Sequence, residues 1–193
     1  YKEMENGFIG GHAPASKENL IYFDHLTDKI VVNLRDPRQS IVSWVHYMEY
    51  LRYTGNYAAL VEYNLSKSYF SMSLSDQIDW QIDNYFLKIN INWIKGWINA
   101  KDSNYFNGEI LYLNYELLVD NMDDYFNSIL SFYNIDKNKF KYPSVPNFKK
   151  NTHKRKGDKN EWKDVLTISQ INKINYQIPN TWFNNFKWEK DVQ

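Results

Sequence analysis

The sequence predicts an α/β fold with a mainly parallel sheet flanked by helices. Two short β-rich runs, 29–34 and 110–115, are separated by segments in which apolar residues recur at helical spacing. Strands that alternate with helices are typical of a parallel sheet covered by helices. The chain shows no internal repeat and no linker rich in Pro, Gly and Ser, so its 193 residues predict a single domain over 1–193.

The N-terminal third begins with a brief predicted strand and loop over 8–14, followed by the strand over 29–34. A helix over 37–53 comes next, because Asp36 is a good N-cap and Pro37 suits the first helical position. Its apolar stripe comprises Ile41, Trp44, Val45, Met48 and Leu51.

The rest of the chain alternates between irregular and regular segments. The pattern predicts an irregular Tyr-rich stretch over 54–75, a long helix from Asp76 to about Ala100, a strand over 110–115, a helix over 121–133, a loop over 141–163 and a last helix from Thr167 or Ser169.

An arginine and a serine are placed where they can share one anion. Arg35 ends the first strand, and Ser43 lies on the following helix, off its apolar stripe. Charge-assisted hydrogen bonds from a planar guanidinium to phosphate are strong and directional. His12 and Tyr115 also lie at or just beyond predicted strand ends, where parallel sheets bind ligands. The sequence therefore predicts a local anion site.

The composition narrows the class of function. The formal net charge is zero, which argues against a nucleic-acid or acidic-membrane partner, and no apolar run approaches the roughly 20 residues of a membrane span. The absence of cysteine excludes disulfides and thiolate metal ligands. The four histidines are scattered, so we expect no metal site.

A basic segment over 149–156 is followed by Gly157. Taken alone, such a segment is typical of a solvated loop or of a nucleic-acid patch. The glycine permits a close approach of the backbone, so amide N–H groups can join the side chains around an anion.

Together these segments resemble the sulfotransferase family, especially its cytosolic branch that acts on small acceptors. The family's 3′-phosphate motif is a strand ending in Arg with Ser eight positions later, as at Arg35 and Ser43. Its late Arg-Lys-Gly motif is matched by Arg155, Lys156 and Gly157. The resemblance implies that these five residues bind the 3′-phosphate of the sulfuryl donor.

Further segments extend the resemblance over nearly the whole chain. The run 160–164 (Asn-Glu-Trp-Lys-Asp) is similar to the family's Gly-Asp-Trp-Lys-Asn, and 95–97 (Lys-Gly-Trp) has its counterpart in a family helix. Tyr115 matches a family tyrosine that lies near the adenine. His12 stands in a Gly-Gly-His-Ala-Pro loop similar to the family's Lys-Thr-His-Leu-Pro loop, and Gly10 replaces the lysine. The resemblance implies that His12 is the catalytic base.

The resemblance implies a P-loop-nucleotide-kinase-like sulfotransferase fold and a cytoplasmic location. The donor would be 3′-phosphoadenosine 5′-phosphosulfate and the product 3′-phosphoadenosine 5′-phosphate. The acceptor would be a small molecule or glycan with a hydroxyl or amine. The family's dimer motif is matched in part, at Lys163, Thr167 and Ile168, with Asn172 in place of glutamate, so a homodimer is implied in part.

The family's first strand and its 5′-phosphosulfate loop have no counterpart in residues 1–11, so we expect an N-terminally incomplete sulfotransferase domain. The alternative is a catalytically silent nucleotide- or phosphate-binding module of the same fold. An RNA-binding protein is a third hypothesis, which zero net charge disfavours. Two interpretations are open for the aromatic residues, which either line an acceptor pocket or cover the core: Tyr50, Tyr53, Tyr57, Tyr63, Tyr69 and Phe70.

Overall fold

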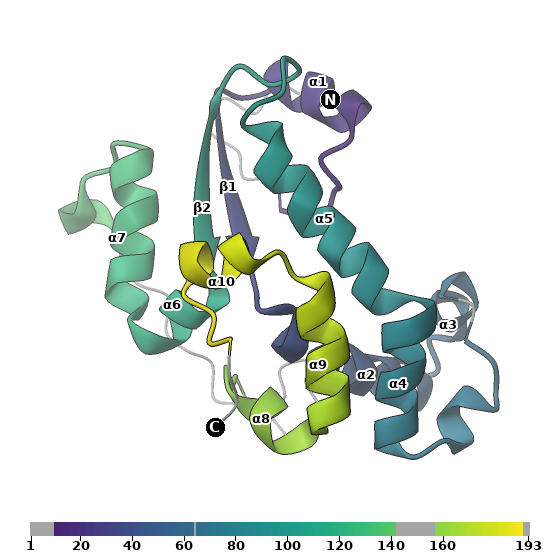
Figure 1. Ribbon diagram of the computed structural model, residues 1–193. Helices are drawn as coiled ribbons and strands as arrows, with labels where there is room; N and C mark the ends of the chain where they lie inside the picture. The colour runs from purple at the N-terminus through teal and green to yellow at the C-terminus, as the bar shows by residue number, and fades with distance from the viewer. Residues whose placement is uncertain (1–9, 64, 142–156, 191–193) are drawn as a thin grey trace.

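The computed structural model describes residues 10–63, 65–141 and 157–190. Within them two strands, β1 (Lys29–Leu34) and β2 (Glu109–Asn114), pair in parallel, with Lys29 opposite Glu109 and Leu34 opposite Asn114. Helices flank this small parallel sheet, which confirms the predicted α/β fold class (Figure 1).

The remaining elements of the described chain are helices and short 3₁₀ turns. In chain order they are α1 Lys17–Asp24, α2 Pro37–Tyr53, α3 Tyr57–Glu62, η1 Tyr69–Ser71, α4 Leu74–Asn84, α5 Phe86–Ala100, α6 Tyr115–Asp120, α7 Met122–Phe132, η2 Lys137–Lys139, α8 Glu161–Val165, α9 Ile168–Gln177 and α10 Asn180–Phe186.

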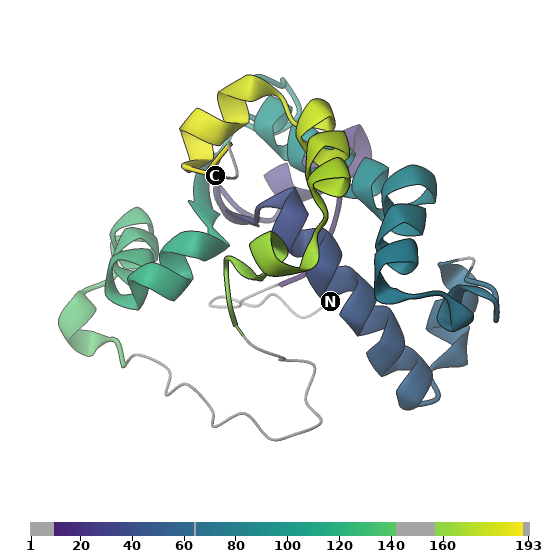
Figure 2. The same cartoon turned by 60° about the horizontal axis from the view of Figure 1, so that its bottom comes forward.

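The helices enclose a main core that includes the inward side chains of the sheet. α5 runs beside the sheet on one side and α7 on the other, while α10 lies near the carboxyl ends of the strands (Figure 1). α8 and α9 pack against α2 (Figure 2). Val32 and Leu34 of β1 are buried in the same cluster as Ile94 and Trp97 of α5. A second cluster, around Met48, joins the far end of α2 to Leu60 of α3 and Tyr69 of η1.

Local signals predicted β1 and α2 with the observed bounds. Asp36 is the N-cap of α2 and accepts the Arg38 N–H at 2.8 Å, and Pro37 occupies the first turn. Thr167 caps α9 and forms a reciprocal capping box with Gln170. These caps are set by neighbouring residues, which is why the sequence reveals them.

The predicted helix from Asp76 to Ala100 is wrong, because two helices fill that range. α4 is capped by Ser73 and ends at Asn84, and the next residue, Tyr85, has backbone angles φ −145° and ψ −79°. The break places the rings of Tyr85 and Phe86 against Trp44 of α2, with centroids 6.4 and 4.8 Å away. The break between the two helices therefore coincides with ring stacking between α2 and this segment, and no Pro or Gly lies at the break.

Three further predictions need correction. The stretch over 54–75, predicted to be irregular, contains α3, η1 and the start of α4. The second strand ends at Asn114 and not at Tyr115, because the Asn114 side chain accepts the Leu117 N–H and caps α6 directly. The predicted loop over 141–163 is interrupted by α8. Of the predicted strand and loop over 8–14, residues 8–9 lie outside the described residues, and residues 10–14 form no strand. Most of the predicted loop over 141–163 also lies outside the described residues.

Among the described residues no helix is both long and apolar enough to cross a membrane. The same part of the chain holds no cluster of three or more His, Cys, Asp or Glu side chains that could bind a metal ion.

Candidate functional site

The turn after β1 positions the first predicted pair of ligand-binding residues. Arg35 follows the strand at once and is half-buried, and the Asp36 cap starts α2 two residues later. Ser43 lies on the second turn of that helix and is also half-buried. Both side chains therefore keep part of their surface available to a ligand.

Tyr115 meets Arg35 because of the register of the sheet. Since Leu34 pairs with Asn114, Arg35 and Tyr115 occupy the next matched positions beyond the two strand ends. The Arg35 Cζ atom lies 4.2 Å from the centroid of the Tyr115 ring, which is a cation–π contact. Two predicted donor-binding residues, 80 positions apart in the chain, are therefore in contact.

Gly157 brings the third predicted segment to the same place. Its φ of +71° is a left-handed conformation that favours glycine, and a Cβ built there would lie 3.9 Å from the Tyr115 hydroxyl. That distance is ordinary contact, so the backbone angle, and not a lack of space, explains the glycine. Arg155 and Lys156 lie outside the described residues.

His12 lies on a different segment, which α5 holds in place. Trp93 donates its indole N–H to the carbonyl oxygens of His12, at 3.3 Å, and of Ala13, at 2.9 Å. Trp97 donates to the Ala13 carbonyl at 3.1 Å. The backbone of the loop is thus fixed, while the His12 residue itself is exposed and accessible from solvent.

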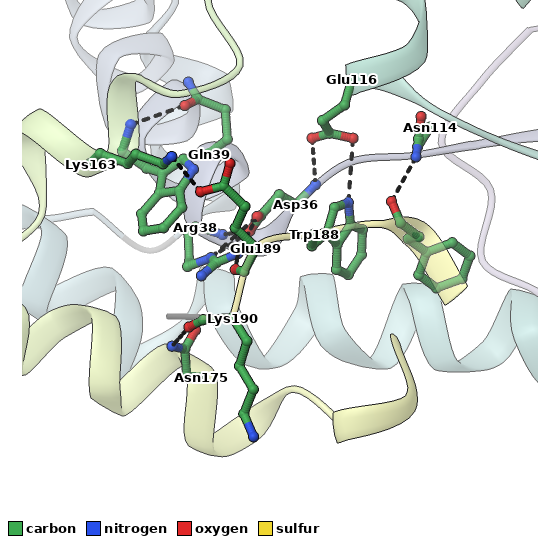
Figure 3. Close-up of polar contacts among 12 residues, drawn as sticks. Asp36, Arg38, Gln39, Asn114, Glu116, Lys163, Asn175, Trp188, Glu189 and Lys190 are labelled. Atoms are coloured by element: carbon green, nitrogen blue, oxygen red, sulfur yellow. Dashed lines mark hydrogen bonds and ion pairs between the residues drawn. The ribbon is translucent and has the colours of Figure 1, made fainter. Parts of the chain in front are cut away.

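A buried charge network underlies the Arg35 turn (Figure 3). Arg38 is fully buried, and its Nε and Nη2 atoms donate to the Asp36 carboxylate at 2.6–3.2 Å. Its Cζ atom lies 3.9 Å from the centroid of the Trp162 ring. The buried cation is therefore paired within its own turn and covered by an aromatic face.

Glu116, on α6, connects this turn to the segment that follows β2 (Figure 3). Its Oε1 accepts the backbone N–H of Asp36 at 3.2 Å, and its Oε2 accepts the indole N–H of Trp188 at 3.3 Å. Burial raises the pKa of the Glu116 carboxyl, and these hydrogen bonds act in the opposite direction.

The segment after α10 lies beside Asp36 and Glu116. Arg38 donates to the Glu189 carbonyl, Lys163 forms an ion pair with the Glu189 carboxylate, and Asn175 donates to the Lys190 carbonyl at 3.1 Å. A pocket of about 450 Å³ lies beside this segment, with Asp36, Glu116, Trp188 and Glu189 among its lining residues.

The model of the sulfotransferase domain family matches residues 21–181 of the chain. The chain belongs to the sulfotransferase family. Comparisons with curated proteins and with solved structures return no match. Membership of the family supports a sulfotransfer activity in general, and the roles of individual residues stay predictions.

The matched range of the sulfotransferase domain contains Arg35, Ser43, Tyr115 and the Arg-Lys-Gly segment over 155–157. His12 precedes this range. The histidine therefore depends on the loop resemblance and on its anchorage to α5.

The candidate acceptor aromatics of the domain divide into two groups. Tyr69 is buried, it accepts a hydrogen bond from Gln81 at 3.2 Å, and burial raises the pKa of its hydroxyl to about 12. Tyr53 and Tyr57 are exposed. Three others are partly buried against the second core cluster: Tyr50, Tyr63 and Phe70. The core interpretation therefore holds for Tyr69, whereas the other three pack against the core and keep part of their surface exposed.

Sequence reasoning missed Arg38, Glu116 and Trp188 as parts of the site. The signal for Arg38 was present, because a second arginine follows an acidic N-cap by two residues. Glu116 follows Tyr115 and could have been identified in the same way. Nothing in the sequence near Trp188 indicates its partner, which lies 72 residues earlier.

Proposed function

We propose that this sulfotransferase domain binds 3′-phosphoadenosine 5′-phosphosulfate and transfers the sulfuryl group to a hydroxyl or amine acceptor. The observation that carries the proposal is the contact between Arg35 and Tyr115, with the Gly157 backbone beside the tyrosine hydroxyl. Three segments that separately resemble parts of the donor site meet at the carboxyl ends of the sheet.

The chemistry of Arg35 suits the 3′-phosphate of the donor. A guanidinium stacked on a ring still directs its N–H groups outward in its own plane, where they can bind phosphate oxygens in pairs. The Ser43 hydroxyl is a further donor from the adjacent helix. In this proposal Arg155, Lys156 and the Gly157 amide complete the phosphate site, and Tyr115 lies near the adenine.

His12 serves as the general base in this proposal. When bound, the donor supplies a sulfuryl group that passes to the acceptor as its sulfur–oxygen bond to the 5′-phosphate breaks. His12 takes the proton from the acceptor oxygen or nitrogen as the new bond to sulfur forms, which requires an accessible imidazole on a fixed backbone. Such base catalysis typically contributes about 10²- to 10⁴-fold to the rate.

Calorimetry with two nucleotides tests the phosphate assignment. Adenosine 3′,5′-bisphosphate, the transfer product, should bind at least about tenfold more tightly than 5′-AMP, because one charge-assisted hydrogen bond alone contributes roughly 1.5–3 kcal/mol. Arg35→Ala should reduce this preference about tenfold, which corresponds to the loss of one charge-assisted interaction. Arg52→Ala is the control, because Arg52 is half-exposed and pairs with Glu49 at 2.8 Å, elsewhere on α2. Equal affinities of the unmodified chain for both nucleotides would contradict the assignment.

A further inference from the structure

Beyond the last residue pair of the parallel sheet, a side chain takes the place of a backbone hydrogen-bond acceptor. Leu34 and Asn114 are the final backbone partners, and β2 turns into α6 immediately after Asn114. The backbone of β2 can therefore supply no strand partner for the Asp36 N–H, and a buried N–H without a partner is unfavourable. The Glu116 carboxylate accepts this N–H at 3.2 Å instead.

This hydrogen bond lies one position beyond the contact between Arg35 and Tyr115. Arg35 precedes Asp36, and Tyr115 precedes Glu116, so the hydrogen bond and the cation–π contact join the same two chain segments at successive positions. Release of the Asp36 N–H would let the Arg35 backbone move relative to the Tyr115 ring.

The Glu116 side chain is itself fixed from a third segment. Trp188 is buried and donates its indole N–H to the second carboxylate oxygen at 3.3 Å, so each oxygen of Glu116 receives one donor (Figure 3). A carboxylate accepts on both oxygens, whereas an amide offers one oxygen and directs N–H groups from its other end. An amide at this position would therefore lose one of the two bonds, and its neutral oxygen would accept the other more weakly than the charged carboxylate does, so the Asp36 N–H is held less firmly in either orientation.

We propose that Glu116 is a positioning residue that holds Arg35 against Tyr115 for binding of the 3′-phosphate, with Trp188 fixing the carboxylate. The proposal rests on the proposed function, because the 3′-phosphate is the ligand whose binding Glu116 supports. Glu116 touches no part of this ligand and acts through the Asp36 backbone.

Two measurements on the chain carrying Glu116→Gln test the proposal. Calorimetry should show that the preference for adenosine 3′,5′-bisphosphate over 5′-AMP falls about threefold, less than in Arg35→Ala, because Arg35 is still present but is held less firmly. Hydrogen exchange in the absence of nucleotide should be faster at the Asp36 amide and unchanged at the amides of β1. If Glu116 had a purely structural role, Glu116→Gln would lower the affinities for both nucleotides equally.

Two further variants complete the experiment. Glu109→Gln is the matched control, because Glu109 is an exposed acid at the other end of β2, and it should change neither readout. Trp188→Phe keeps a ring and removes only the second donor, so it should reduce the preference less than Glu116→Gln, and it provides the test if Glu116→Gln does not fold.

The outcomes separate the two proposals. An unmodified chain that prefers the bisphosphate, together with an undiminished preference in Glu116→Gln and Trp188→Phe, would overturn the positioning role and leave the phosphate site intact. An unmodified chain without any preference would overturn the proposed function and, with it, the positioning role. Unchanged exchange at the Asp36 amide in Glu116→Gln would also overturn the positioning role.

Discussion

Asp36 has three structural roles at the start of α2. Its carboxylate caps the helix at the Arg38 N–H, pairs with the buried Arg38 guanidinium, and leaves its own backbone N–H to Glu116. A cation in the protein interior is tolerated when an anion and further hydrogen bonds compensate for its lost hydration. The Arg-Asp-Pro-Arg sequence thus encodes both the helix start and the partner of its buried charge.

Replacement of Arg38 by methionine should strongly destabilise the domain. Arg38→Met leaves the Asp36 carboxylate buried without its cation, and breaking a buried pair from one side costs about 3–5 kcal/mol. Arg52→Met should lower the free energy of unfolding by only about 0–1 kcal/mol, because the pair of Arg52 with Glu49 is exposed. Urea unfolding followed by tryptophan fluorescence measures both, and equal losses would contradict the account of Arg38.

At the scale of elements, the sequence predicts those features whose causes are local. The bounds of β1 and α2 follow from a β-rich run, an acidic cap and apolar spacing. The break at Tyr85 and the start of α6 at Tyr115 were missed. The first accompanies ring stacking on Trp44, and the second results from a capping asparagine at the end of a strand, where the β-pattern is stronger.

Gly157, in the segment before α8, has a backbone conformation that favours glycine. Gly157 and Gly55 have similar φ angles, +71° and +73°, so alanine at either position should lower the free energy of unfolding by about 1 kcal/mol. Gly157 lies beside the Tyr115 hydroxyl, whereas Gly55 lies in the turn after α2.

Only Gly157→Ala should therefore weaken the binding of adenosine 3′,5′-bisphosphate, as measured by calorimetry beside thermal unfolding of both variants. A matching loss of affinity in Gly55→Ala would show that backbone strain in general, and not the site, controls binding.

At the scale of the whole molecule, the candidate site joins segments that are distant in the chain. Sequence reasoning selected Arg35 and Tyr115 separately, and the parallel register brings them into contact. It could not find the Trp188 contact with Glu116, because that contact depends on the path of the chain after α10. The sequence therefore predicted Arg35 and Tyr115 as candidate site residues. The hydrogen bond by which Trp188 fixes Glu116 could be found only in the tertiary structure.

In the proposed function, sulfate transfer depends on both the Arg35 site and the His12 loop. The direct measurement uses donor labelled in its sulfuryl group, the full-length protein, and a panel of phenols, alcohols, sugars and amines. His12→Ala is compared with His25→Ala, which changes an exposed histidine at the end of α1.

The account predicts transfer by the full-length protein and by its His25→Ala variant. It predicts loss of transfer in His12→Ala, with the affinity for adenosine 3′,5′-bisphosphate retained. Full transfer in His12→Ala would remove His12 from the mechanism. Nucleotide binding without transfer to any acceptor would contradict the enzyme and favour the catalytically silent module.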